Sequence, residues 1–154
     1  MKLSFSTRHA GADSFVGLCD KTAQYGFQGF EIYDAAREKK EHADSIFHSY
    51  LTPGAKRKLV NRHISLCALT WPQPVTAATD PADLVGYVEL AATAGAENVI
   101  LSMDPVPENI AAILTPAARR AQELGVMVLL ETAGPLASTK AALGIIAQVG
   151  SAAM

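Results

Sequence analysis

The sequence is poor in cysteine and holds no long apolar run, and each absence excludes a class of protein. Two cysteines in 154 residues are too few for a disulfide framework. Cys19 and Cys67 each stand in an apolar segment, which favours small core residues over catalytic thiols. No apolar run reaches the ~20 residues that a membrane helix needs, and the first residues predict a strand where a signal peptide would have an apolar core. We therefore expect a cytoplasmic protein without a membrane segment.

Charge and several well-known motifs are scarce as well. Charged residues make up 18% of the chain, the formal net charge is -2, and 49% of the residues are hydrophobic. The near-neutral balance gives no reason to expect nucleic acid as a partner, and the hydrophobic share predicts one globular domain over residues 1–154. A glycine-rich phosphate loop, a Cys-x-x-Cys pair and a nucleophile elbow are all missing. The usual signatures of nucleotide binding, thiol redox chemistry and serine hydrolysis are thus absent.

What the chain does contain is a short apolar run that ends in an acid. Residues 126–130 (Val-Met-Val-Leu-Leu) follow Gly125, a typical helix-ending residue, and precede Glu131. A continuous apolar strand between helices is usually buried on both faces, as in a parallel sheet. Such α/β folds bind their ligands at the carboxyl ends of the strands, so Glu131 stands where a functional acid is expected.

The same strand–helix unit is predicted five times. Apolar segments predict strands at residues 2–7, 27–33, 64–69, 98–102 and 126–130. One helix is predicted after Ser14, with an end at Gly26 and a buried face of Phe15, Leu18, Cys19 and Thr22. Two helical pieces are predicted within 34–62, with a break at 52–54, and a further helix is predicted from Asp80 to Gly95. The next helix is predicted from about 108 to 124, with a candidate second start at 115–116. The last predicted helix follows Ser138, with Leu143, Ile146 and Val149 on its inward face.

Repeated βα units build parallel sheets with right-handed connections, so the fold class is α/β. Two architectures fit the pattern. One is a doubly wound open sheet, in which five units make a complete domain. The other is part of an eight-stranded barrel, which typically takes ~250 residues. Periodicity alone does not choose between them.

Four segments of the chain carry a resemblance to a known family. Residues 3–7 (Leu-Ser-Phe-Ser-Thr) and 25–32 (Tyr-Gly-Phe-Gln-Gly-Phe-Glu-Ile) resemble the opening of the xylose isomerase-like barrel superfamily. Its members include sugar-phosphate isomerases and epimerases and endonuclease IV-type repair enzymes. Residues 118–131 and 138–150 fit the same family in order. The resemblance implies a partial TIM barrel of about five βα repeats, with the doubly wound sheet as the alternative.

The resemblance also implies a metal site. In that family the Glu at the end of strand five is the first ligand of a divalent metal, and strands six to eight supply Asp, His and Glu. Glu131 takes the first position, so the full-length parent is expected to bind Mn, Mg or Zn. This chain stops where strand six would begin, so we expect no tightly bound metal here. Family members often follow the Glu with Asn-His or Pro-His, whereas residues 132–134 are Thr-Ala-Gly.

Three further residues are candidates for contacts with substrate, and none is assigned as catalytic. Glu31 ends the second strand, where it either hydrogen-bonds a sugar hydroxyl or forms a structural ion pair. His9 follows the first strand, as a substrate contact or an exposed loop histidine. Trp71 follows the third strand, where its ring either stacks on a sugar or covers an apolar edge. The remaining histidines lie in or beside the polar segment and are assigned no chemistry: His42, His48 and His63.

Three functions compete. The leading hypothesis is that the full-length parent isomerises or epimerises a small carbohydrate or hydroxy-ketone with the help of a metal, and that this chain alone is inactive. The alternative is a non-catalytic structural or assembly module that self-associates through open sheet edges into a homo-oligomer. A third is a complete flavodoxin-like binding domain, with residues 8–12 as a weak phosphate-binding turn.

Overall fold

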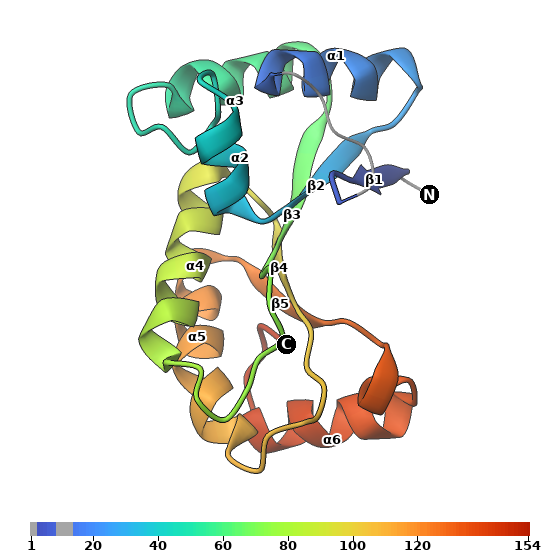
Figure 1. Cartoon of the computed structure of the whole chain (residues 1–154), viewed down its shortest axis with the longest axis vertical. Coiled ribbons are helices and arrows are strands. Elements are labelled where there is room, and N and C mark those ends of the chain that lie inside the picture. The colour runs from blue at the N-terminus through green and yellow to red at the C-terminus, as the bar shows by residue number, and fades with distance from the viewer. Residues whose placement is uncertain (1–2, 9–13) are drawn as a thin grey trace. The chain divides into compact units, whose positions relative to one another are not determined.

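The structure is a computed structural model that describes residues 3–8 and 14–154, in which strands and helices alternate along the chain (Figure 1). The elements are β1 (Ser4–Ser6), α1 (Phe15–Gln24), β2 (Gly29–Tyr33), α2 (Ala35–Glu41), α3 (Thr52–Asn61), β3 (Ser65–Thr70), α4 (Pro81–Ala94), β4 (Asn98–Leu101), α5 (Ile110–Leu124), β5 (Met127–Leu130), the short 3-10 helix η1 (Gly134–Leu136) and α6 (Thr139–Val149). They belong to two compact units, one of residues 1–70 with 93–96 and one of residues 71–92 with 97–154. Across the described residues, no helix combines the length and the apolar character that crossing a membrane requires.

The first unit is built on three parallel strands in sequence order. β2 lies between the other two, and Phe30 is paired in register with Phe5 of β1 and Leu66 of β3. The β2–β3 register shifts between Phe30 and Glu31. Phe30 is fully buried and its ring packs edge-on against that of Phe15 in α1. The helix therefore covers the sheet through large apolar side chains, which is how a βα unit buries its core.

Helix α1 confirms the sequence prediction in detail. The Ser14 hydroxyl accepts a hydrogen bond from the Gly17 N–H at 2.9 Å and so caps the first turn. The helix ends shortly before Gly26, whose φ of 73° places it in the left-handed region that favours glycine. Its buried residues are the four predicted ones. Burial raises the pKa of the Cys19 thiol to about 11, so this cysteine is a protonated core residue at neutral pH.

The polar segment after β2 forms two helices, but the break between them is not where the sequence analysis places it. Residues 42–51 connect α2 to α3, and Thr52 and Pro53 begin α3. Proline is well suited to the first turn of a helix because the N–H that it lacks has no partner there. The Thr-Pro-Gly sequence at 52–54 therefore starts the second helix and does not interrupt one.

The second unit contains the parallel pair β4–β5, with Val99 opposite Val128. The chain that leaves β3 runs along β4, because Trp71 N donates to Ile100 O at 2.9 Å and Val75 N donates to Ser102 O at 2.8 Å. Within each unit consecutive strands are parallel neighbours in sequence order, whereas a doubly wound sheet reverses its strand order. The fold is an α/β fold of parallel βα units, that of a partial TIM barrel.

Two helices of the second unit differ from the sequence prediction. Helix α5 continues through Pro116 without a second start. Helix α6 buries Ala142, Ile145 and Val149, and Leu143 is 56% exposed. The helix is rotated relative to the predicted inward face, so small Ala142 takes the buried place that apolarity alone gives to Leu143.

Candidate functional site

In the first unit, Glu31 lies near the carboxyl end of β2, as predicted. Its half-buried carboxylate accepts a short hydrogen bond from the hydroxyl of Thr70, the last residue of β3. The Thr70 side chain is 5% exposed, so one carboxylate oxygen of Glu31 is anchored to a buried partner. This arrangement holds an acid at the strand ends in a defined orientation.

The ends of β1 and β2 are joined through side chains. The Tyr33 N–H donates to the Thr7 hydroxyl at 3.0 Å, and the Arg8 guanidinium lies 4.9 Å from the centre of the Tyr33 ring. A cation over an aromatic face is attracted by the ring quadrupole. His9, the sequence-based candidate that follows these residues, lies outside the described part of the chain.

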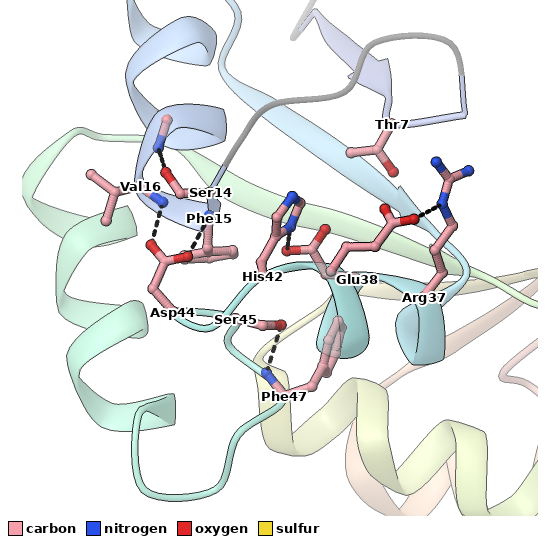
Figure 2. A network of polar contacts seen from close by, with 12 residues as sticks. Thr7, Ser14, Phe15, Val16, Arg37, Glu38, His42, Asp44, Ser45 and Phe47 are labelled. Carbon is pink, nitrogen blue, oxygen red and sulfur yellow. Dashed lines mark hydrogen bonds and ion pairs between the residues drawn. The ribbon is translucent and has the colours of Figure 1, made fainter.

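Helix α2 brings a carboxylate and an imidazole together beside these strand ends. Glu38 Oε1 lies 2.8 Å from His42 Nδ1, and the two side chains are 6% and 11% exposed. Figure 2 shows the two groups facing one another below Thr7. Burial raises the pKa of Glu38, and the contact with His42 opposes that rise. Both residues line a pocket of about 50 Å³ together with Thr7, Tyr33 and Arg37.

The Glu38–His42 pair is absent from the sequence-based expectations, which assign His42 no chemistry. A signal was available, since residues four apart on a helix face the same side and a Glu–His pair at that spacing can interact. What the sequence does not display is the burial of the pair, which depends on how α2 packs in the first unit.

A second carboxylate of this region stabilises the start of α1. The Asp44 oxygens accept hydrogen bonds from the Phe15 and Val16 N–H groups at 2.8 and 2.9 Å. These groups have no partner within the helix itself, so Asp44 supplies a cap from a distant part of the chain (Figure 2). Partial burial acts to raise the pKa of Asp44, but the hydrogen bonds from Val16 and Phe15 outweigh it and hold that pKa below its ordinary value.

In the second unit, Glu131 directly follows β5, and its N–H donates to Leu101 O at 2.9 Å. It lines a pocket of about 100 Å³ together with Asp104, the third residue after β4 ends at Leu101. Gly134 lines the same pocket, and a Cβ added there would lie 3.5 Å from Asp104 Oδ2. Two carboxylates from neighbouring strand ends therefore share one pocket.

Trp71 lies on the other side of the same strand end. Its backbone N–H donates a hydrogen bond to the carbonyl oxygen of Ile100 in β4. Its ring packs edge-on against the Tyr87 ring, with 5.0 Å between the ring centroids. The indole Nε1 is buried and has no hydrogen-bond partner within the described residues. Trp71 lines a pocket of about 220 Å³ with Asp80 and Pro74, and Pro74 also lines the pocket of Glu131. Trp71, Asp104 and Glu131 thus gather around the carboxyl end of β4.

The donor set fits a divalent metal in part. Carboxylate oxygens suit Mg²⁺ and Mn²⁺, and Asp104 and Glu131 offer them from one pocket. In the ranges 3–8 and 14–154, no group of three or more His, Cys, Asp or Glu side chains could hold a metal ion. The pocket of the second unit therefore offers two carboxylates, which is fewer than the ligands that a divalent metal needs.

Comparisons with solved structures bear on the fold. The chain superposes with a TM-score of 0.71 on a xylose isomerase domain protein from Alicyclobacillus acidocaldarius, at 16% identity over 99% of this chain and 61% of that one. D-psicose 3-epimerase from Clostridium cellulolyticum, solved with D-tagatose, gives a TM-score of 0.72 at 13% identity over 98% of this chain and 61% of the epimerase. The fold is that of the xylose isomerase-like TIM barrel. The zinc-bound IolI protein gives a TM-score of 0.66 at 18% identity over 97% of this chain and 59% of its own.

The resemblance read from the sequence is thereby confirmed for the fold. The chain spans about 60% of the length of these xylose isomerase-like barrels. No protein-family model and no curated protein sequence matches it. Identities below 20% relate this chain to such barrels by architecture, so its chemistry is argued from its own residues.

Proposed function

We propose that the chain supplies metal- and substrate-binding strand ends of an isomerase or epimerase that acts on a small carbohydrate or hydroxy-ketone. The observation that carries the proposal is the gathering of Glu131, Asp104 and Trp71 at the carboxyl end of β4. In TIM-barrel enzymes this end of the strands holds the active site. The architectural relatives solved with D-tagatose and with zinc are in keeping with such chemistry.

Each residue has a proposed task. Glu131 and Asp104 would hold the metal, which when bound polarises a carbonyl or hydroxyl oxygen. Trp71 would lay its ring against the apolar face of a sugar and donate its buried Nε1–H to a substrate oxygen. Glu31, kept in place by Thr70, would accept a hydrogen bond from a hydroxyl, and His9 is the proposed contact from the end of β1.

The metal site can be tested on this chain with Mn²⁺, which broadens the NMR signals of nearby nuclei. We expect the amide signals of Asp104, Glu131 and Ala133 to broaden first as Mn²⁺ is added. Glu131→Gln keeps the shape of the side chain but removes its charge, so the same broadening should need at least about tenfold more Mn²⁺, or about 1.4 kcal/mol. Glu108→Gln, at an exposed site outside the pocket, is the control and should change nothing. Equal broadening at all acidic residues would contradict the assignment.

The reaction itself is tested in a protein that carries the remaining strands of the barrel. An isomerase or epimerase moves a carbon-bound proton next to a carbonyl, so it should introduce deuterium into D-fructose or a related ketose in D₂O. Loss of this exchange in Glu131→Gln is the expected result. A metal-loaded protein that exchanges no proton of any ketose or aldose would rule the proposed function out.

A second candidate function, self-association as an assembly module, rests on the surface of β5. Met127 and Leu129 point to the same side of this strand and are 38% and 39% exposed. Paired exposed apolar side chains on a strand are typical of a contact surface. We propose that a second copy of the chain covers them.

Sedimentation velocity at increasing concentration tests this surface. The unmodified chain should form dimers, and Leu129→Lys should shift the protein towards monomer by at least about tenfold in dissociation constant, because a buried charge in an apolar contact is costly. Leu143→Lys, at a more exposed apolar residue of α6, is the matched control and should leave the dimer intact. A wild-type monomer at the highest concentration would exclude the contact.

A further inference from the structure

A largely apolar pocket of about 270 Å³ lies at the amino end of β3, in the first unit. The end of α3, the start of β3 and the end of α4 supply its buried lining, which consists of Leu59, Ile64, Leu66 and Ala94. Glu31 and Thr70 lie towards the carboxyl ends of their strands, so the pocket is separate from the substrate contacts proposed above. An inference about it does not rest on the proposed function.

Two residues of α3 that line the pocket are more open to solvent. Val60 is 70% exposed, and Lys56 is half-buried and is the only charged residue among the described lining residues. A Cβ added at Gly95 would lie 3.2 Å from Lys56 Cε and 3.6 Å from Lys56 Nζ. The Lys56 side chain therefore lies along the backbone that follows α4, with its methylene groups packed and its ammonium group at the pocket.

The charge of Lys56 has no counter-ion in the first unit. Lys56 takes part in none of the ion pairs that the described residues form. Helix α3 carries two more cations, Arg57 and Lys58, and no acid. The carboxyl end of α4 has a partial negative charge, which explains a cation nearby. It does not explain the open apolar space beside that cation, which suits a ligand that is apolar and anionic at once.

The lining also indicates the size and charge of that ligand. A neutral apolar molecule would cover the Lys56 ammonium without pairing it, which is costly, whereas a carboxylate would supply the counter-ion. One lining cation suits a monoanion, and the volume is just below the ~300 Å³ at which pockets begin to take drug-sized molecules. We propose that the pocket binds a small aliphatic monocarboxylate, with its alkyl chain against Leu59, Ile64 and Leu66 and its carboxylate beside Lys56.

The test is an NMR titration of the chain with octanoate and, separately, with 1-octanol at pH 7. We expect amide shifts around Val60, Ile64 and Gly95 that saturate at millimolar octanoate, and binding of 1-octanol that is at least about fivefold weaker. Lys56→Met keeps an apolar side chain of similar length but removes the charge, so it should bind both compounds equally. Lys40→Met, at an exposed site of α2 outside the pocket, is the matched control and should keep the preference for octanoate.

Chain length tests the apolar part of the site without any variant. Burial of one further CH₂ group strengthens binding by up to about fourfold. The affinity of the unmodified chain should therefore rise from butanoate to hexanoate to octanoate. Equal affinity for the three acids would show that the alkyl chain lies outside the pocket, against the proposal.

Several other outcomes would overturn the proposal. One is 1-octanol that binds the unmodified chain as tightly as octanoate does. Another is an undiminished preference for octanoate in a Lys56→Met variant with unchanged circular dichroism. A third is a response to vesicles that contain phosphatidylglycerol but none to octanoate, which would make the region a membrane contact. Saturable octanoate binding in a chain that fails the Mn²⁺ titration would support this pocket and reject the metal site.

Discussion

Replacing Gly29 by alanine is expected to lower the free energy of unfolding by about 3 kcal/mol, at the upper end of the cost of overpacking a core. Gly29 is buried in β2, opposite Ser65 in the β3 register. A Cβ at this position would overlap Cys67 Sγ and lie 2.7 Å from the Ser65 carbonyl oxygen. The second contact is with backbone, so the strands must separate to relieve it. Urea unfolding followed by circular dichroism measures the loss.

A matched control and a rescue variant make this prediction specific. Gly86 lies in α4 with open space around it, so Gly86→Ala should be neutral or stabilise the helix by up to about 1 kcal/mol. Adding Cys67→Ala to Gly29→Ala removes the sulfur contact but not the carbonyl contact, so recovery should be partial. A Gly29→Ala chain as stable as the unmodified one would show that the β2–β3 spacing is wider than described.

Replacing Asp44 by alanine is expected to cost about 2 kcal/mol at pH 7, the upper end for loss of a helix cap. Its carboxylate accepts hydrogen bonds from the N–H groups of Phe15 and Val16. Phe15 is fully buried, so no water easily replaces the lost acceptor, and an unsatisfied buried donor is penalised. The Ser14 hydroxyl accepts a hydrogen bond only from the N–H of Gly17. The N–H groups of Phe15 and Val16 would therefore have no acceptor in Asp44→Ala.

The Asp44 effect should depend on pH in a defined direction. Because the pKa of Asp44 is lowered in the folded chain, its charge contributes stability above the unfolded value near pH 4. That contribution is lost as the pH falls through the lower folded pKa. The stability gap between the unmodified chain and Asp44→Asn should therefore narrow when urea midpoints are compared at pH 7 and about pH 3. Glu108→Gln is the control, and a gap that widens in acid would contradict the assignment.

Local signals explain which parts of the fold could be predicted from the sequence. Helix α1 is defined by a serine before its first turn and a glycine after its last one, and both act on their immediate neighbours. The apolar run before Glu131 predicted a strand with an acid at its end, and the structure places that acid in a pocket at the strand ends. The expected burial of this strand on both faces is wrong, because Met127 and Leu129 are 38% and 39% exposed. Such features need no knowledge of distant residues.

Contacts between distant residues could not be predicted in the same way. Asp44 caps a helix 28 and 29 residues away in the chain, and its sequence context contains no sign of that partner. Asp104 is not among the candidates predicted from the sequence, yet it shares a pocket with Glu131 because β4 and β5 are adjacent. In α6, Leu143 is apolar but exposed, since the packing of the whole helix decides which side faces inward.

The position of Pro74 has a practical consequence for altering this molecule. The residue borders both the space beside Trp71 and the space beside Glu131, and it belongs to a single loop between β3 and α4. Loops of this kind tolerate changes in length far better than strands do. Insertions or deletions in residues 72–79 should therefore reshape two neighbouring pockets in one step. Libraries that diversify this loop alone would alter both pockets and leave the strands and helices unchanged.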